Sequence, residues 1–86
     1  MKLTRTTEIS PPRGGEVVYA AHVDGRRIGW VGDERAWRGH RFGGRRWWAA
    51  WREDGDTAAR WNTGDHPLRT RAEAVAALTQ AFISGT

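Results

Sequence analysis

Residues 16–31 read EVVYAAHVDGRRIGWV, and this stretch decides the fold because it carries the strongest hairpin signal in the chain. Two runs rich in Val, Ala, Ile and aromatic residues flank Asp24-Gly25, a dipeptide typical of the two-residue type I′ turn. The predicted cross-strand pairs are Val23 with Arg26, Ala21 with Ile28, and Tyr19 with Trp30. The register therefore predicts one apolar sheet face, made of Val17, Tyr19, Ala21, Val23, Ile28 and Trp30.

A second Asp-Gly pair, Asp54-Gly55, joins the runs RRWWAAWRE (residues 45–53) and DTAARWN (residues 56–62). The same turn geometry places Trp48 opposite Trp61 on one face, which we assign to the core because it is apolar except near the turn. The opposite face is then open to solvent or to a partner. It consists of Trp47, Ala49, Trp51, Glu53, Ala58, Arg60 and Asn62.

The C-terminal segment predicts a helix. Thr70-Arg71-Ala72-Glu73 forms a capping box, and Gly85 is placed to end the helix. Apolar residues recur between them at helical spacing: Ala74, Ala77, Leu78, Ala81 and Phe82. The expected fold is α+β, an antiparallel sheet of two β-hairpins (about four strands) with one C-terminal α-helix packed on one face.

The remaining segments read as loops. Residues 1–15 are polar and end in PPRGG, which predicts a flexible N-terminal arm before a single α+β domain over residues 16–86. Residues 32–46 are rich in glycine and arginine and predict a loop, with room for a short strand over Trp37–Arg41.

Composition excludes several classes of protein. The chain has 86 residues, no cysteine, and no apolar run long enough for a membrane span, so we expect no disulfide and no membrane partner. The N-terminus lacks the apolar core of a signal peptide, which favours a cytoplasmic protein. We expect no enzyme, no cofactor and no metal, because the two serines are near the termini and His22, His40 and His66 occur in separate segments.

Positive charge is concentrated in the middle of the chain. Residues 26–52 contain eight arginines against Asp33 and Glu34, whereas the flanking segments are neutral or acidic. Within WRGHRFGGRRWWAAWRED (residues 37–54), arginines that can bind phosphate or guanine alternate with tryptophans that can stack on bases. The alternative interpretation is that Trp47 and Trp51 pack against the first hairpin and the arginines are merely solvated. The candidate nucleic-acid-binding residues are Arg38, Arg41, Arg45, Arg46, Trp47, Trp51 and Arg60.

The pattern WRGHR (residues 37–41), WWAA (residues 47–50) and a T-x-x-E-A helix start at Thr70 resembles a known family. It is similar to the ethylene-response-factor (Apetala-type) DNA-binding domain and to the arm-site-binding domains of tyrosine recombinases, over residues 37–82. The resemblance implies a three-stranded sheet that enters the major groove of DNA, with the helix behind it. The outward positions of that family correspond here to Trp47, Ala49, Trp51 and Glu53. Arg52 stands where the family has an aliphatic residue.

The expected function is a small sheet-based DNA-binding module that acts on double-stranded DNA, as an accessory or regulatory protein of a phage or mobile element. The alternative is a protein-interaction module that uses an exposed Trp/Arg face to bind a partner protein or a second copy in a homodimer, without nucleic acid. A third reading is a tryptophan-packed domain with no exposed ring cluster.

Overall fold

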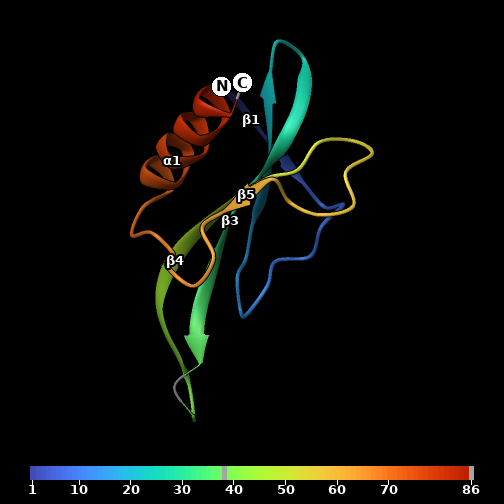
Figure 1. The fold of residues 1–86 in the computed structure, drawn as a ribbon. Coiled ribbons are helices and arrows are strands. Elements are labelled where there is room, and N and C mark those ends of the chain that lie inside the picture. Colours follow the sequence, from blue (N-terminus) through green and yellow to red (C-terminus); the bar gives the residue numbers. More distant parts are fainter. Residues whose placement is uncertain (38, 86) are drawn as a thin grey trace.

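The computed structural model of the chain describes residues 1–37 and 39–85, except for the side chains of Trp37 and Phe42. It has the α+β fold that the sequence predicts: one antiparallel sheet in the order β1-β2-β3-β4-β5, with a C-terminal helix against one face (Figure 1). The elements are β1 (Lys2–Thr6), β2 (Val18–Val23), β3 (Arg26–Trp37), β4 (Phe42–Trp51), β5 (Trp61–Asn62) and α1 (Arg71–Ser84).

The first hairpin forms at the predicted turn, but its register changes within the strands. Asp24 and Gly25 have positive φ angles of 51° and 78°, as a type I′ turn requires, and Val23 pairs with Arg26. Beyond His22 the register shifts, so that Ile28 is an extra residue on β3. The predicted pairs of Ala21 with Ile28 and of Tyr19 with Trp30 are therefore wrong. The observed pairs are Ala21 with Gly29, Ala20 with Trp30, and Tyr19 with Val31.

The bulge moves Trp30 to the sheet face away from the helix, because a shift of one residue exchanges the two faces of a strand. We call this side the helix-free face. Val17, Ala21 and Ile28 remain in the core as predicted, and Val31 joins them. Ala74 and Leu78 are the fully buried residues with which α1 covers this core.

The predicted faces of β4 are reversed. Trp47, Ala49 and Trp51 are buried in the core on the helix side, with exposed fractions of 8, 1 and 6%. Trp48 pairs with Gly32 on the helix-free face. The physical reason is that β4 takes its register from β3, whereas β5 has only two residues and pairs Trp51, not Trp48, with Trp61.

Two segments expected to be irregular contribute strands. Residues 2–6 form β1, which pairs with β2 along its whole length, so the expected flexible arm is wrong for these residues. β3 continues to Trp37 and β4 begins at Phe42, so much of the expected loop over residues 32–46 is paired sheet. None of the described residues belongs to a helix long and apolar enough to cross a membrane.

Candidate nucleic-acid interface

The paired ends of β3 and β4 form a projection that we call the basic arm (residues 35–46). Figure 1 shows these strand ends extending past the helix, and the molecule measures 42 Å along its longest axis against 24 Å along the others. The sequence of residues 35–46 contains five arginines, four of them among the described residues, and no Asp or Glu. The whole chain has a formal net charge of +4, of which residues 35–46 contribute +5, so all the other residues together carry a net charge of −1. The positive excess therefore resides in the arm.

A buried carboxylate holds the base of the arm. Asp33 is fully buried and accepts hydrogen bonds from the backbone N–H of Glu16 (2.7 Å) and of Val17 (2.8 Å), and from Nε of Arg45 (2.9 Å). Burial alone would raise the pKa of Asp33. The hydrogen bonds from Val17, Glu16 and Arg45, with the charge of Arg45, outweigh burial and hold this pKa below its ordinary value. Asp33 thus ties the loop before β2 and one arm arginine to β3.

The arginines of the arm differ in how they are held. The Arg45 guanidinium, besides its bond to Asp33, lies 4.6 Å from the centre of the Trp47 ring. Arg35 lies 3.9 Å from the Glu16 carboxylate. Arg46 is exposed, and its guanidinium donates to the carbonyl of Arg45 at 3.0 Å. Arg41 is exposed, and among the described residues neither Arg41 nor Arg46 has a carboxylate within ion-pair distance.

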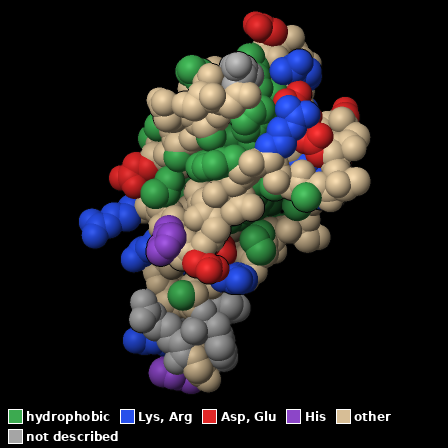
Figure 2. Space-filling view, viewed as in Figure 1, with side chains coloured by type: hydrophobic (Ala, Val, Ile, Leu, Met, Phe, Trp, Pro, Cys, Tyr) green, Lys and Arg blue, Asp and Glu red, His purple; other side chains and the backbone are tan. Residues whose placement is uncertain are grey.

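Not all the predicted binding residues lie together. Arg41, Arg45 and Arg46 come together on the arm, with the buried Trp47 at its base. Arg38 lies outside the described residues. In Figure 2, basic side chains appear in blue on the lower part of the molecule, toward the arm, and also near the opposite end.

Trp51 ends β4 at that opposite end, about 30 Å from the first residue of the strand at 3.3 Å per residue, and Arg60 lies just before β5. Arg60 bonds to Glu53 and Asp56, each at 2.9 Å, and lies over the Trp51 ring. Two hydrogen bonds hold the pKa of Asp56 below its ordinary value: the larger effect comes from the Arg60 guanidinium and the smaller one from the Glu53 backbone N–H. This is a closed ion-pair cluster. The expectation that Trp51 and Trp47 lie open is wrong, and so is the outward placement carried over from the resemblance.

Sequence reasoning missed Trp48 on the helix-free face. A Cβ atom added to Gly32 would lie 2.6 Å from the Trp48 ring, so the indole occupies the space that a side chain on β3 would fill. The indole Nε1 donates to the carbonyl of Asp33 at 3.2 Å. The glycine inside β3 was the available signal, because glycine in a strand often marks a close approach of another group.

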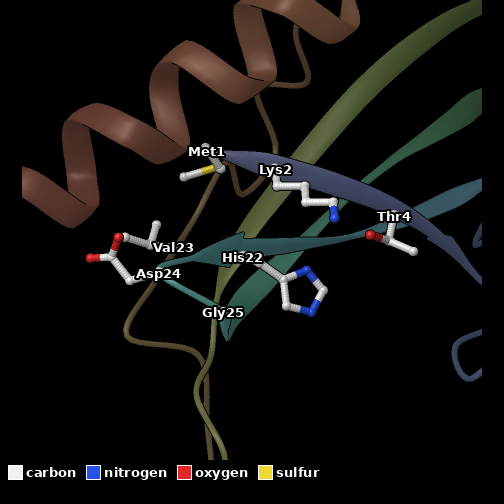
Figure 3. A pocket seen from close by; sticks show the side chains of 7 residues that line it. All are labelled: Met1, Lys2, Thr4, His22, Val23, Asp24 and Gly25. Atoms are coloured by element: carbon white, nitrogen blue, oxygen red, sulfur yellow. The ribbon is translucent and has the colours of Figure 1, made fainter.

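The helix-free face also carries a hollow at its β1 edge, with a volume of about 620 Å³, which we call the β1-edge hollow; Lys2 and Asp24 are charged residues in its lining. Figure 3 shows Lys2 and Thr4 of β1 and His22 of β2 extending on the same side of the sheet. A neighbouring hollow of about 430 Å³ shares Thr4 and His22 and adds Arg27. Nδ1 of His22 and Nε of Arg27 are buried without a hydrogen-bond partner among the described residues.

Comparison with known proteins finds no matching family model, no similar curated protein and no similar solved structure. Across residues 1–37 and 39–85, no group of three or more His, Cys, Asp or Glu side chains is placed to hold a metal ion.

Proposed function

We propose that the protein is a small nucleic-acid-binding module whose basic arm contacts the phosphates of double-stranded DNA. The observation that carries the proposal is the concentration of the positive excess on one projecting hairpin, with Arg41 and Arg46 free of carboxylate partners in the described part of the chain. Arginine binds phosphate and the guanine edge with paired hydrogen bonds. A two-stranded ribbon also fits the width of the major groove.

The arm also shows a local electrostatic cost that a polyanion would relieve. Arg35 and Arg45 are direct cross-strand partners in the β3–β4 ladder. Like charges in opposing positions destabilise a sheet. Asp33 and Glu16 offset part of this repulsion, and phosphates along the arm would offset the rest.

The proposal keeps the duplex partner implied by the family resemblance but changes the contacting residues. Trp47, Ala49 and Trp51 pack in the core on the helix side, so they are replaced by the exposed arginines of the arm. The proposed role is that of an accessory or regulatory protein of a phage or mobile element, acting in the cytoplasm, and its support is the resemblance to the arm-site-binding domains of tyrosine recombinases.

Fluorescence anisotropy with a short labelled duplex tests the proposal. The Arg41→Ala/Arg46→Ala variant should lose roughly tenfold or more in affinity, because each arginine lost at a nucleic-acid contact costs about 1–3 kcal/mol. The matched control is Arg26→Ala/Arg52→Ala, which removes the same charge from exposed residues away from the arm. It should stay within about twofold of wild type. Equal losses in both variants would show that only net charge matters and would contradict the proposal.

The protein-interaction alternative remains an outcome of the same experiment. That alternative expected Trp51 on an exposed face. In the structure Trp51 is buried against Phe82, with the ring centroids 5.3 Å apart. A chain that binds no duplex at low salt, and that light scattering shows to be a dimer, would favour this alternative over DNA binding.

A further inference from the structure

We infer that the groove beside Trp48 on the helix-free face receives an unpaired nucleobase, which stacks on the indole. This inference rests on the proposed function and extends its substrate class to DNA that carries single-stranded nucleotides next to the duplex held by the arm. Three observations carry it: the fixed position of the Trp48 ring, the groove beside it, and the position of Arg46 on the same face.

The Trp48 side chain is held in place before any ligand binds. The Cζ2–Cε2–Nε1 edge of its indole lies over Gly32, and its Nε1 donates to the Asp33 carbonyl. The side chain is nevertheless half-buried rather than buried, unlike Trp47 and Trp51 on the other face. A rigid, partly exposed indole loses little conformational entropy when a ring stacks on it.

A groove of about 240 Å³ lies beside this ring. Three parts of the chain line this groove together with Trp48. They are the loop before β2 (Pro12, Arg13), Glu34 of β3, and the segment from Asn62 of β5 to Gly64. Asn62 uses its side-chain oxygen to accept from the backbone N–H of Gly64 (2.7 Å), which leaves its amide nitrogen available as a donor. Carboxylate, amide and guanidinium groups beside an aromatic ring are the groups that recognise the edges of a base.

Arg46 connects the groove to the arm. It lies two residues before Trp48 on β4, and successive side chains of a strand alternate between the two faces. Arg46 and Trp48 therefore occupy the same sheet face, opposite Glu34 and Gly32 of β3 in the strand register. Their Cα atoms are about 7 Å apart on a strand that rises 3.3 Å per residue. The Arg46 guanidinium lies beside Gly44, on the arm side, so a strand whose base stacks on Trp48 reaches Arg46 with the phosphates that run on toward the arm.

The geometry favours an unpaired base over a paired one. Bases within a duplex are stacked on each other, and an indole fixed in a sheet reaches a base face only when that base leaves the stack. Trp30 on the same face is a poorer platform, because the Arg27 guanidinium lies 4.3 Å from its ring centre.

The β1-edge hollow offers a phosphate contact farther along the same face. The β1 residue level with Trp48 is Thr6, three strand spacings or about 14 Å away, and Lys2 lies four residues, or about 13 Å, farther along β1. A strand that leaves Trp48 must therefore run diagonally across the sheet for about 20 Å to reach Lys2. The Lys2 ammonium and the His22 ring extend on the same side of the sheet (Figure 3).

The test uses three labelled probes in anisotropy titrations: a single strand, a strand of equal length and charge that lacks its bases, and a duplex. The wild-type protein should bind the intact single strand about tenfold more tightly than the abasic strand, because stacking of one base is worth about 1–3 kcal/mol. Trp48→Ala should abolish this difference, and Trp48→Phe should retain part of it. Trp61→Ala, a change of another half-buried tryptophan on the helix side, should retain it.

The outcomes separate this inference from the proposed function. Equal affinity of the wild-type protein for intact and abasic strands would overturn the base site, whatever the variants do, and needs no substituted protein to fold. If duplex binding still depends on Arg41 and Arg46, the proposed function survives that result. Absence of binding to every probe would overturn both.

Discussion

At the residue scale, the side chain of Asp33 joins three parts of the molecule. One buried carboxylate accepts three hydrogen bonds that join the loop before β2, the strand β3 and Arg45 of the arm. A buried carboxylate without such donors would be strongly destabilising. Here the donors outweigh burial, and the arm is positioned as a consequence.

Asp33 should make stability depend on pH in the acid range. Its pKa in the folded protein lies below that of the unfolded chain, which is about 3.9. Its stabilising contribution is therefore fully present above that value and is lost as the pH falls through the folded-state pKa. We expect Asp33→Asn to lower the free energy of unfolding at neutral pH by about 2 kcal/mol.

The measurement is thermal unfolding of wild type and Asp33→Asn between about pH 7 and pH 2.5. The difference in melting temperature between the two proteins should shrink as the pH falls below 4. A difference that is constant over the whole range would contradict the assigned role, because other carboxylates contribute equally to both proteins.

Gly32 should not tolerate even the smallest side chain. An added Cβ atom would lie 2.6 Å from the Trp48 ring, so Gly32→Ala must displace the indole and should cost about 1–3 kcal/mol of stability. Gly44→Ala is the control, because its Cβ would meet only the end of the Arg46 side chain, at 3.4 Å. Urea unfolding of the two variants measures the difference, and equal stabilities would refute the packing of Trp48 on Gly32.

The faces of the tryptophans could not be predicted from alternation. In RRWWAAWR both faces of the strand carry Trp and Ala, so hydrophobicity alone gives no reason to prefer one register. On β3, one extra residue at Ile28 moved Trp30 to the face opposite to the one expected. The residues nearest the first turn, by contrast, were predictable because the type I′ geometry fixes their pairing.

At the element scale, α1 is the part that local sequence determines best. The Thr70 half of the predicted capping box is confirmed: Thr70 Oγ1 accepts from the backbone N–H of Glu73 at 3.1 Å. The Glu73 carboxylate accepts from the backbone N–H of Arg69 (3.3 Å) instead of that of Thr70. Gly85 ends the helix as predicted and donates its N–H to the Ala81 carbonyl, in a right-handed conformation. Capping needs only neighbours in sequence, which is why it can be read from the sequence.

Removal of this cap should destabilise the protein measurably. Thr70→Ala leaves the Glu73 N–H without its partner and should cost about 1 kcal/mol of unfolding free energy. Thr79→Ala, in the middle of the same helix, is the control, since its hydroxyl caps no helix end: it bonds to the Val75 carbonyl of the preceding turn (2.8 Å) and makes a long contact with the Met1 sulfur (3.9 Å). Denaturation followed by circular dichroism compares them. A larger loss in the control variant would contradict the capping account.

The basic arm was predictable in charge but not in structure. Glycine and arginine at positions 38–46 lack the alternation that marks a strand, and β pairing there depends on tertiary contacts. Those contacts are the bond from the Arg35 N–H to the Arg13 carbonyl and the mutual bonds between Trp47 and Leu68. β1 was missed for the same reason, because KLTRT carries one aliphatic residue, Leu3.

At the scale of the whole molecule, shape and charge coincide. The sequence was sufficient for the α+β class and for the basic middle segment. It was insufficient to show that the positive excess lies on one projection while the rest of the chain is slightly negative.

Binding of a duplex to the arm should stabilise the folded protein. A saturating duplex should raise the melting temperature of wild type and of Arg26→Ala/Arg52→Ala, but should raise that of Arg41→Ala/Arg46→Ala far less.

The most direct test of the central claim is the salt dependence of duplex binding. Each phosphate contact releases about one counterion, so the logarithm of the binding constant falls linearly with the logarithm of salt concentration, with a slope of about −0.9 per contact. The arm account predicts that Arg41→Ala/Arg46→Ala makes this slope shallower by about 2, while Arg26→Ala/Arg52→Ala leaves it unchanged. Identical slopes for wild type and the arm variant would contradict the account.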